Sequence, residues 1–402
     1  MKKLATKSVW LLLSVVLASL FGYSFHFLAS RALGPAAYGY YTVLMALMIA
    51  FLRPLEAISP LVARTLIENP TANRQFLLRD FASLALLTGT ILGAVQFIFL
   101  LFWTPPKGPS ELAVFFISGL TILVWACLYF YRGVLQSRYQ DNPLLYNRPS
   151  ELLGRLLSGV LLFILGKGVL PAILSGLVGA VAAVIQGFFY TGTELNLTYK
   201  IDRAIIAEYA KILLITLPGG LFISLDMIIA GKIFSPFNCG QYAIVNMIGK
   251  GILLYALAAS PLVYPRLVKH RVSKKGAYYL GLGYLFAGLV FFAAFIFFAF
   301  YGEETIGLLF GRSYTPAAGY LPIYIIVMFP LCLNYGVINL KAATGGWSEG
   351  IFLWVLLAGY TVVLLSSPAD FFDYFTRIGI FQSLTATAGW LFGAVKTRHT
   401  RR

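Results

Sequence analysis

Long apolar stretches separated by short polar segments recur throughout the sequence, and this pattern restricts the fold more than any other feature. A helix that crosses a bilayer needs roughly 20 mostly apolar residues. Charged residues make up only 11% of the chain, against about 25% in an ordinary soluble domain. The sequence therefore predicts an all-α integral membrane protein with about twelve transmembrane helices, at about residues 9–30, 39–61, 81–103, 112–134, 150–166, 169–191, 209–231, 241–264, 277–301, 319–340, 350–366 and 373–395.

Basic residues alternate between the two sides of this predicted helical array. Of the 31 Lys and Arg residues, 22 lie at the two termini and in every second gap between stretches, whereas five lie in the other gaps. Cytoplasmic loops carry an excess of Lys and Arg. We therefore expect an even number of spans, both termini in the cytoplasm, and a place in the inner (plasma) membrane. The apolar segment 9–29 is longer than the roughly 7–15-residue apolar core of a signal peptide. We therefore expect that it is not cleaved and forms the first span.

The composition also excludes several classes of function. A net charge of +16 in a soluble chain would indicate nucleic acid, but here the excess is explained by orientation, and no nucleic-acid partner is expected. The three cysteines and three histidines are scattered without metal-ligand spacing, so we expect no metal and no cofactor. The longest gaps, about 20 residues each, are too short for a soluble domain.

The two halves of the chain align when one is shifted by 201 residues. The block Ser59-Pro60-Leu61-Val62 falls on Ser260-Pro261-Leu262-Val263, and Arg31 falls on Lys232. Three more identities share this shift: Pro35 with Pro236, Gly39 with Gly240, and Tyr41 with Tyr242. Because six spans is an even number, the repeats are parallel, which is a design used by transporters. We expect two six-helix lobes, residues 1–200 and 201–402, related by a pseudo-twofold axis; common ancestry alone would leave the same pattern.

The segment from Arg31 to Tyr41, with the sequence RALGPAAYGYY, resembles the first outer loop of bacterial polysaccharide flippases. These proteins belong to the multidrug/oligosaccharidyl-lipid/polysaccharide (MOP) exporter superfamily, and their pattern is Arg, a small residue, Leu-Gly-Pro, two residues and Tyr-Gly. Three weaker resemblances follow in order along the chain, at Leu217-Pro218 with Asp226, at Gly240-Gln241-Tyr242-Ala243, and at residues 304–314.

This resemblance implies a MATE-like V shape, in which two lobes surround a central cavity, and a flippase that exports a lipid-linked oligosaccharide or polysaccharide precursor from the inner to the outer leaflet. It implies as partners the lipid-linked glycan, membrane lipid, and a polysaccharide polymerase or glycosyltransferases of the same pathway. The chain is short for the family and lacks the two extra C-terminal spans of peptidoglycan-precursor flippases, so lipid II fits less well as substrate.

The outer motif has a structural interpretation besides a role in gating. Gly34 and Pro35 end the first helix, because proline cannot continue the helical hydrogen bonds and glycine permits a turn. Tyr38, with its tyrosine neighbours after Gly39, would then lie at the level of the lipid headgroups. Pro218, in the middle of the seventh span, is a candidate hinge.

Ionisable residues inside spans are functional candidates. Arg53 lies deep in the second span with Glu56 one turn later, so the two form a self-satisfied pair or Arg53 binds an anionic headgroup. Arg155 and Arg377 lie nearer span ends, where snorkelling explains them, and Arg155 follows Glu151 by one helical turn.

A polar stripe runs along the eighth span. Tyr242, Asn246 and Lys250 recur every fourth residue and should face a cavity rather than lipid. Asp226 lies at a similar depth in the seventh span. Either Asp226 and Lys250 pair across adjacent helices, or Asp226 carries a coupling ion, Na⁺ or H⁺, whose binding frees Lys250 for the substrate in a cationic cavity.

Three other functions remain open. A multidrug exporter of the same superfamily is the nearest alternative, because the deep charges balance at two basic and two acidic residues. A membrane-embedded glycosyltransferase or polymerase would have to use Glu303, Glu304 and Arg312 in the longest outer loop, about residues 302–318. A scaffold subunit would not need buried Arg53 or Lys250. We expect a transporter and not an enzyme.

Overall fold

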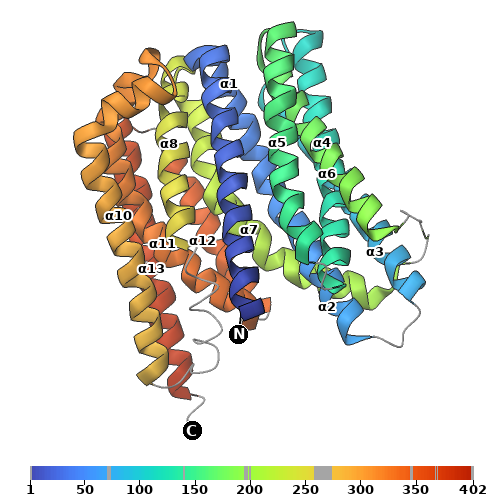
Figure 1. Cartoon of the computed structure of the whole chain (residues 1–402). Helices are drawn as coiled ribbons and strands as arrows, with labels where there is room; N and C mark the ends of the chain where they lie inside the picture. The colour runs from blue at the N-terminus through green and yellow to red at the C-terminus, as the bar shows by residue number, and fades with distance from the viewer. Residues whose placement is uncertain are drawn as a thin grey trace. The chain divides into compact units, whose positions relative to one another are not determined.

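The computed structural model describes residues 2–69, 74–138, 141–193, 198, 201–257, 274–344, 347–366, 368 and 370–399. All regular secondary structure in this part is helical, and short turns and connections join the helices (Figure 1). A helix occupies each of the twelve predicted stretches as far as they are described. The elements are α1 (Lys2–Glu56), α2 (Ile58–Glu68), α3 (Arg74–Trp103), α4 (Pro109–Ser137), α5 (Asp141–Leu165), α6 (Val169–Thr191), α7 (Arg203–Ile233), α8 (Pro236–Leu257), α10 (Lys274–Leu309), the 3₁₀ segment η1 (Arg312–Tyr320), α11 (Leu321–Thr344), α12 (Trp347–Leu365) and α13 (Phe371–His399).

Seven helical segments within the described residues are long and apolar enough to cross a membrane. The first of them, Leu13–Glu68, has 56 residues, which at 1.5 Å each is about 84 Å, far more than the roughly 30 Å hydrocarbon core. It therefore supplies two spans. Most apolar side chains of Gly281–Leu309 in α10 are exposed, since only 11% of its apolar window is buried, and lipid is the environment that such a surface fits.

The first two spans separate at Gly34, as the sequence predicts. Gly34 has φ 71° and ψ 171°, a backbone conformation that essentially only glycine adopts. A second prediction for the outer side is wrong: Glu303 and Glu304 do not lie in a loop, because α10 continues to Leu309 after a non-helical residue at Tyr301.

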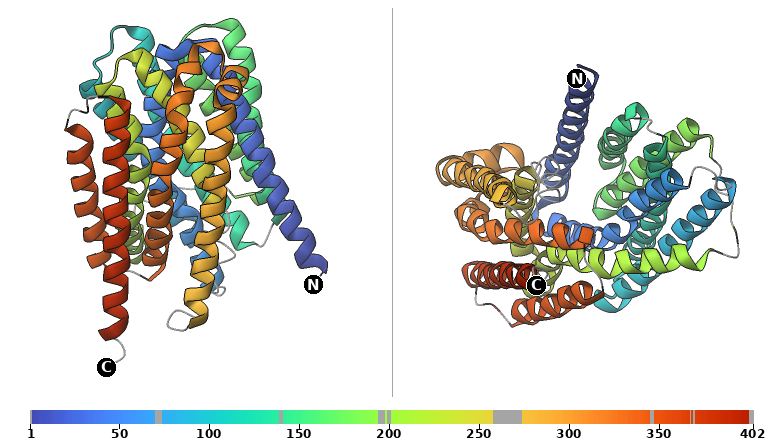
Figure 2. Two further views of the ribbon diagram at one scale, coloured as in Figure 1. Left: turned by 90° about the vertical axis from the view of Figure 1, so that its left-hand side faces the viewer. Right: turned by 90° about the horizontal axis from the view of Figure 1, so that it is seen from below.

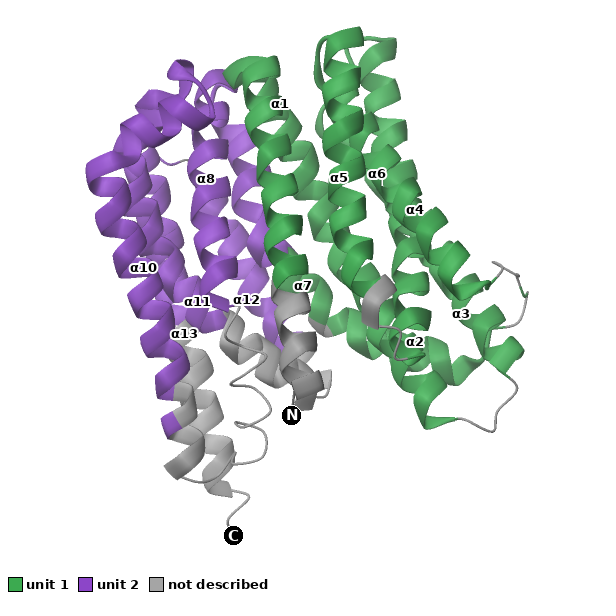
Figure 3. Ribbon diagram, in the orientation of Figure 1, with its two compact units in different colours: residues 1–220 green, residues 221–402 purple. Residues whose placement is uncertain are grey.

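The chain divides into two compact units, Met1–Gly220 and Leu221–Arg402 (Figure 3). In unit 1, α4 is central and packs on α2, α3 and α6. Small residues allow this: a Cβ added to Gly93 of α3 would lie 2.5 Å from the carbonyl oxygen of Gly119 in α4, an approach typical of helix pairs in membranes. In unit 2, α11 packs between α10 and α13 (Figure 2).

The boundary between the units falls within α7, directly after Pro218, Gly219 and Gly220. All three are buried. The division at residue 200, expected from the repeat, stays a prediction about ancestry.

Several helix boundaries in the described residues follow the 201-residue repeat. The break at Gly34 corresponds to the connection between α7 and α8, α3 corresponds to α10, and α6 corresponds to α13. The repeated block at Ser260 to Val263 and the loop charges from Arg266 to Arg271 lie outside the described residues. Within the described residues, the repeat is therefore visible in helix boundaries as well as in the short identical blocks.

Replacing Gly34 by alanine should destabilise the protein. Nothing lies within 4 Å of the added Cβ, so the cost is backbone strain alone, about 1–3 kcal/mol. Thermal unfolding of the detergent-solubilised protein measures it. Gly176→Ala is the matched control, because this glycine also has open space around its Cβ but lies within helix α6. Equal unfolding temperatures for the two variants would contradict the assignment of strain to Gly34.

Candidate functional site

Asp226 is the centre of a buried polar cluster in unit 2. It lies on α7, is 2% exposed, and accepts hydrogen bonds on both carboxylate oxygens. Lys250 Nζ of α8 lies 2.8 Å from Oδ1. Oδ2 accepts from the Tyr242 hydroxyl at 2.8 Å, the Asn246 amide at 2.6 Å and the Tyr324 hydroxyl at 2.9 Å. The polar stripe predicted on the eighth span therefore faces Asp226.

Aromatic rings enclose this cluster. The Tyr374 hydroxyl of α13 donates to the backbone carbonyl of Asp226 at 2.6 Å, and the rings of Tyr242 and Phe375 stack with centroids 5.9 Å apart. Gly249 lets α8 approach α11, because a Cβ added there would lie 2.5 Å from the ring of Tyr324. Four helices of unit 2 thus contribute to one buried site.

The two carboxylate oxygens of Asp226 are satisfied unevenly. Each oxygen of an ionised carboxylate offers about two acceptor positions; Oδ1 accepts from Lys250 alone, whereas Oδ2 accepts from Tyr242, Asn246 and Tyr324. The Asp226–Lys250 pair ties α7 to α8.

Arg53 and Glu56 form the second predicted site, in unit 1. Arg53 Nη1 lies 2.9 Å from Glu56 Oε2, and the Tyr129 hydroxyl of α4 donates to Glu56 Oε1 at 3.1 Å. The two charged side chains are about a third and a quarter exposed. Gly220 packs directly against Arg53, since a Cβ there would lie 2.6 Å from Arg53 Cγ.

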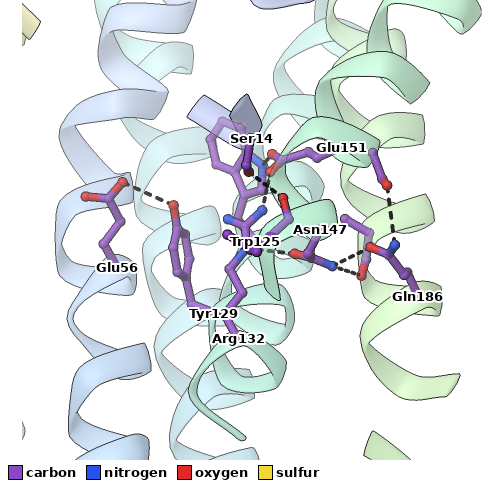
Figure 4. A network of polar contacts seen from close by, with 11 residues as sticks. Ser14, Glu56, Trp125, Tyr129, Arg132, Asn147, Glu151 and Gln186 are labelled. Carbon is purple, nitrogen blue, oxygen red and sulfur yellow. Dashed lines mark hydrogen bonds and ion pairs between the residues drawn. The ribbon is translucent and has the colours of Figure 1, made fainter. Parts of the chain in front are cut away.

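A larger polar network lies next to this pair (Figure 4). Arg132 of α4 binds Glu151 of α5 at 2.7 Å and Asn147 at 2.8 Å. The Trp125 indole also donates to Glu151, at 3.1 Å, and the Asn147 amide donates to Gln186 of α6 at 2.9 Å. These contacts hold three helices of unit 1 together through polar groups within the spans.

The structure corrects the interpretation of Arg155. It neither snorkels nor pairs with Glu151, whose carboxylate is bound by Arg132. Instead Arg155 is 9% exposed, donates to the Tyr41 hydroxyl, and lies over the ring of Phe25 with 4.2 Å between its Cζ and the ring centroid. Arg377 does lie near its helix start, paired with Asp373 at 2.8 Å.

The tyrosines of the outer motif do not lie where the sequence predicts. Tyr38 and Tyr41 are fully buried in unit 1 and do not face the lipid headgroups. Tyr38 hydrogen-bonds His26 at 3.0 Å, and the carbonyl of Gly39 accepts from Thr42 at 2.8 Å. Arg31 is exposed, and Pro35 follows the break at Gly34. The motif therefore forms the break after the first span and also contributes buried tyrosines to the interior of unit 1.

The structure thus brings Asp226, Tyr242, Asn246 and Lys250 together in unit 2, and Arg53 with Glu56 in unit 1. Sequence reasoning missed Tyr324, Tyr374 and the Arg132–Glu151 pair. Single polar residues on apolar helices mark such positions, but their partners lie about 20 to 150 residues away in sequence. Among the described residues, no group of His, Cys, Asp and Glu could hold a metal ion.

No protein-family model and no curated protein sequence matches the chain. Solved structures do. An inward-facing MATE family multidrug transporter of the MOP superfamily superposes with a TM-score of 0.74 over 96% of this chain and 95% of the other, at 13% identity. The chain has the MATE transporter fold.

Two further solved structures share this MATE fold. An outward-facing MATE family multidrug transporter gives a TM-score of 0.61 at 14% identity, over 98% of this chain and 95% of the other. A MOP superfamily transporter from Pyrococcus furiosus gives 0.60 at 13% identity over the same shares, and its binding pocket is described as having reverse polarity, which suggests a different function for that protein.

Breaking the Asp226–Lys250 pair should destabilise the protein strongly. Asp226→Asn or Lys250→Met leaves one buried charge unpaired, which costs about 3–5 kcal/mol, and the double variant should regain most of the loss. Thermal and denaturant unfolding in detergent measure the cycle. Arg64→Gln is the control, because its pair with Glu68 is exposed on both side chains and is worth about 0–1 kcal/mol. Purely additive losses in the double variant would contradict the coupling.

Proposed function

We propose that the chain is a transporter that flips an anionic, lipid-linked oligosaccharide or polysaccharide precursor from the inner to the outer leaflet by alternating access. The observation that carries the proposal is the buried Asp226–Lys250 pair in a chain of MATE fold. Ionisable residues inside the membrane are costly and are typical of ion and substrate pathways.

In the proposed cycle, Lys250 alternates between Asp226 and the substrate. A proton or Na⁺ bound at Asp226 releases the ammonium group, which then binds the pyrophosphate of the lipid-linked glycan. Arg53, paired with Glu56 at the partly exposed site of unit 1, supplies a second cation. The membrane field helps to expel an anion from a negative interior by about 2.3 kcal/mol per unit charge per 100 mV.

The choice of a glycan substrate rests on the outer motif from Arg31 to Gly39, together with Arg53 and Lys250. The proposal includes the predicted cationic central cavity and an inner-membrane location with cytoplasmic termini. It also includes association with a polymerase or glycosyltransferases of the same pathway. Pro218 and the two glycines after it are the proposed hinge, because the helix passes there from one compact unit to the other.

A cation-coupled multidrug exporter is the second candidate, favoured by one observation. The rings of Tyr242, Tyr324 and Tyr374 surround Asp226, and aromatic faces beside a carboxylate suit organic cations. Lys250 opposes it, because its ammonium group already occupies the position beside the carboxylate. We propose no enzymatic activity: Glu303 and Glu304 are exposed on α10.

The test of the substrate is flipping of a lipid-linked oligosaccharide in proteoliposomes. Arg53→Ala and Lys250→Ala should each reduce the rate at least tenfold, since each removes one charge contact with the anion, worth about 1.5–3 kcal/mol. Arg64→Ala, an exposed basic residue, is the control. Wild-type rates in both variants, or transport of organic cations in place of the glycan, would contradict the proposal.

The coupling ion is tested separately. If Asp226 carries the ion, Asp226→Asn transports without responding to an imposed pH or Na⁺ gradient, because the amide binds neither ion as a carboxylate does. Initial rates with and without each gradient measure this, and Tyr324→Phe, which keeps the carboxylate, should still respond. A full gradient response in Asp226→Asn would place the coupling elsewhere.

A further inference from the structure

Arg155 is a buried cation to which the described part of the chain gives no anionic partner. It lies ten residues before the end of α5 at Leu165, about 15 Å along the helix, and therefore within the span. Its Nε has no hydrogen-bond partner and is buried. A guanidinium left unpaired in the hydrocarbon region costs several kcal/mol, so a counter-charge is required.

The groups that face Arg155 from each packed helix are neutral or occupied. From α1, the contacts are the hydroxyl of Tyr41, the sulfur of Met45 at 3.8 Å and the face of Phe25. The ring of His26, also on α1, lies beside Phe25 and Tyr41 and close enough to interact electrostatically with Arg155. From α6, Gly179 lies against the backbone nitrogen and Cβ of Arg155. On its own helix, Glu151 is bound by Arg132 and Trp125.

Three residues around Arg155 are the repeat counterparts of the Asp226 cluster. With the shift of 201 residues, Tyr41 corresponds to Tyr242, and Met45 corresponds to Asn246. The counterpart of Asp226 is Phe25, so the carboxylate of unit 2 is replaced by an aromatic ring. In unit 2, the buried cation beside these positions is Lys250, which pairs with Asp226. In unit 1 it is Arg155, and the described residues of α1, α5 and α6 give it no free carboxylate.

We propose that the guanidinium of Arg155 and the hydroxyl of Tyr41 bind a small inorganic anion of the chloride class inside unit 1. A small monovalent anion suits the apolar surroundings that Phe25 and Met45 give Arg155, because it loses less on leaving water than a divalent anion and one guanidinium neutralises it fully. A divalent phosphate would bring a second, uncompensated charge into the same apolar surroundings. This site does not depend on which substrate the protein transports.

Anion-dependent stability tests the site with the full-length protein in an uncharged detergent. At equal ionic strength, sodium chloride or bromide should raise the unfolding temperature above that in sodium gluconate, saturably and by roughly 5 °C. Arg155→Gln should abolish this difference. Arg64→Gln, which removes an exposed basic residue, should keep it.

A second variant keeps the test decisive if Arg155→Gln does not fold. Phe25→Glu places a carboxylate at the repeat counterpart of Asp226, beside the guanidinium, and should make the unfolding temperature independent of chloride. Phe25→Leu, which supplies no charge, should still respond to chloride. Equal stability of the wild type in chloride and gluconate would overturn the proposal, and stronger stabilisation by phosphate would overturn the assignment to a small monovalent anion.

Crystals grown in bromide give the position directly. We expect an anomalous bromide peak within about 3.5 Å of Arg155 Nε, absent in Arg155→Gln crystals or, if that variant does not fold, in Phe25→Glu crystals. Bromide found only at the protein surface would overturn the proposal.

Discussion

The cost of placing charge in hydrocarbon governs the interior of this protein. The backbone satisfies its own hydrogen bonds by forming helices. The ionised side chains within the spans are then the groups whose loss of hydration must be compensated by partners in the protein. Asp226 is compensated by Lys250 and three neutral donors. Arg132 is compensated by Glu151 and Asn147. Each solution joins neighbouring helices, and so the charges also help to fix the packing within each unit.

Small residues make these polar contacts possible. Gly249 brings α8 against Tyr324, Gly220 brings α7 against Arg53, and Gly179 brings α6 against the backbone of Glu151 and Arg155. A side chain at any of these glycines would push the helices apart and lengthen the hydrogen bonds next to it. Helix spacing and charge compensation are therefore two aspects of one packing arrangement.

The pattern of apolar stretches was sufficient to place the helices, and the break at Gly34 followed from local backbone chemistry. The Arg53–Glu56 pair was also predictable, because its two members lie one helical turn apart. Arg155 was misinterpreted by the same local argument: Glu151 is its helical neighbour, yet tertiary packing gives Glu151 to Arg132. Tyr324 and Tyr374 could not be assigned to Asp226, because 98 and 148 residues separate them in sequence.

The repeat of 201 residues has an evolutionary consequence. A six-helix ancestor inserts in one orientation, so two copies of it could have paired as a symmetric dimer before their genes fused. In such a dimer, the positions of Phe25 and Asp226 were occupied by the same residue. Once the two copies were encoded separately or as one fused chain, that constraint was gone, and one position now carries an acid where the other carries an aromatic ring. The present asymmetry of charge between the halves is thus a property that a dimer of identical copies could not have had.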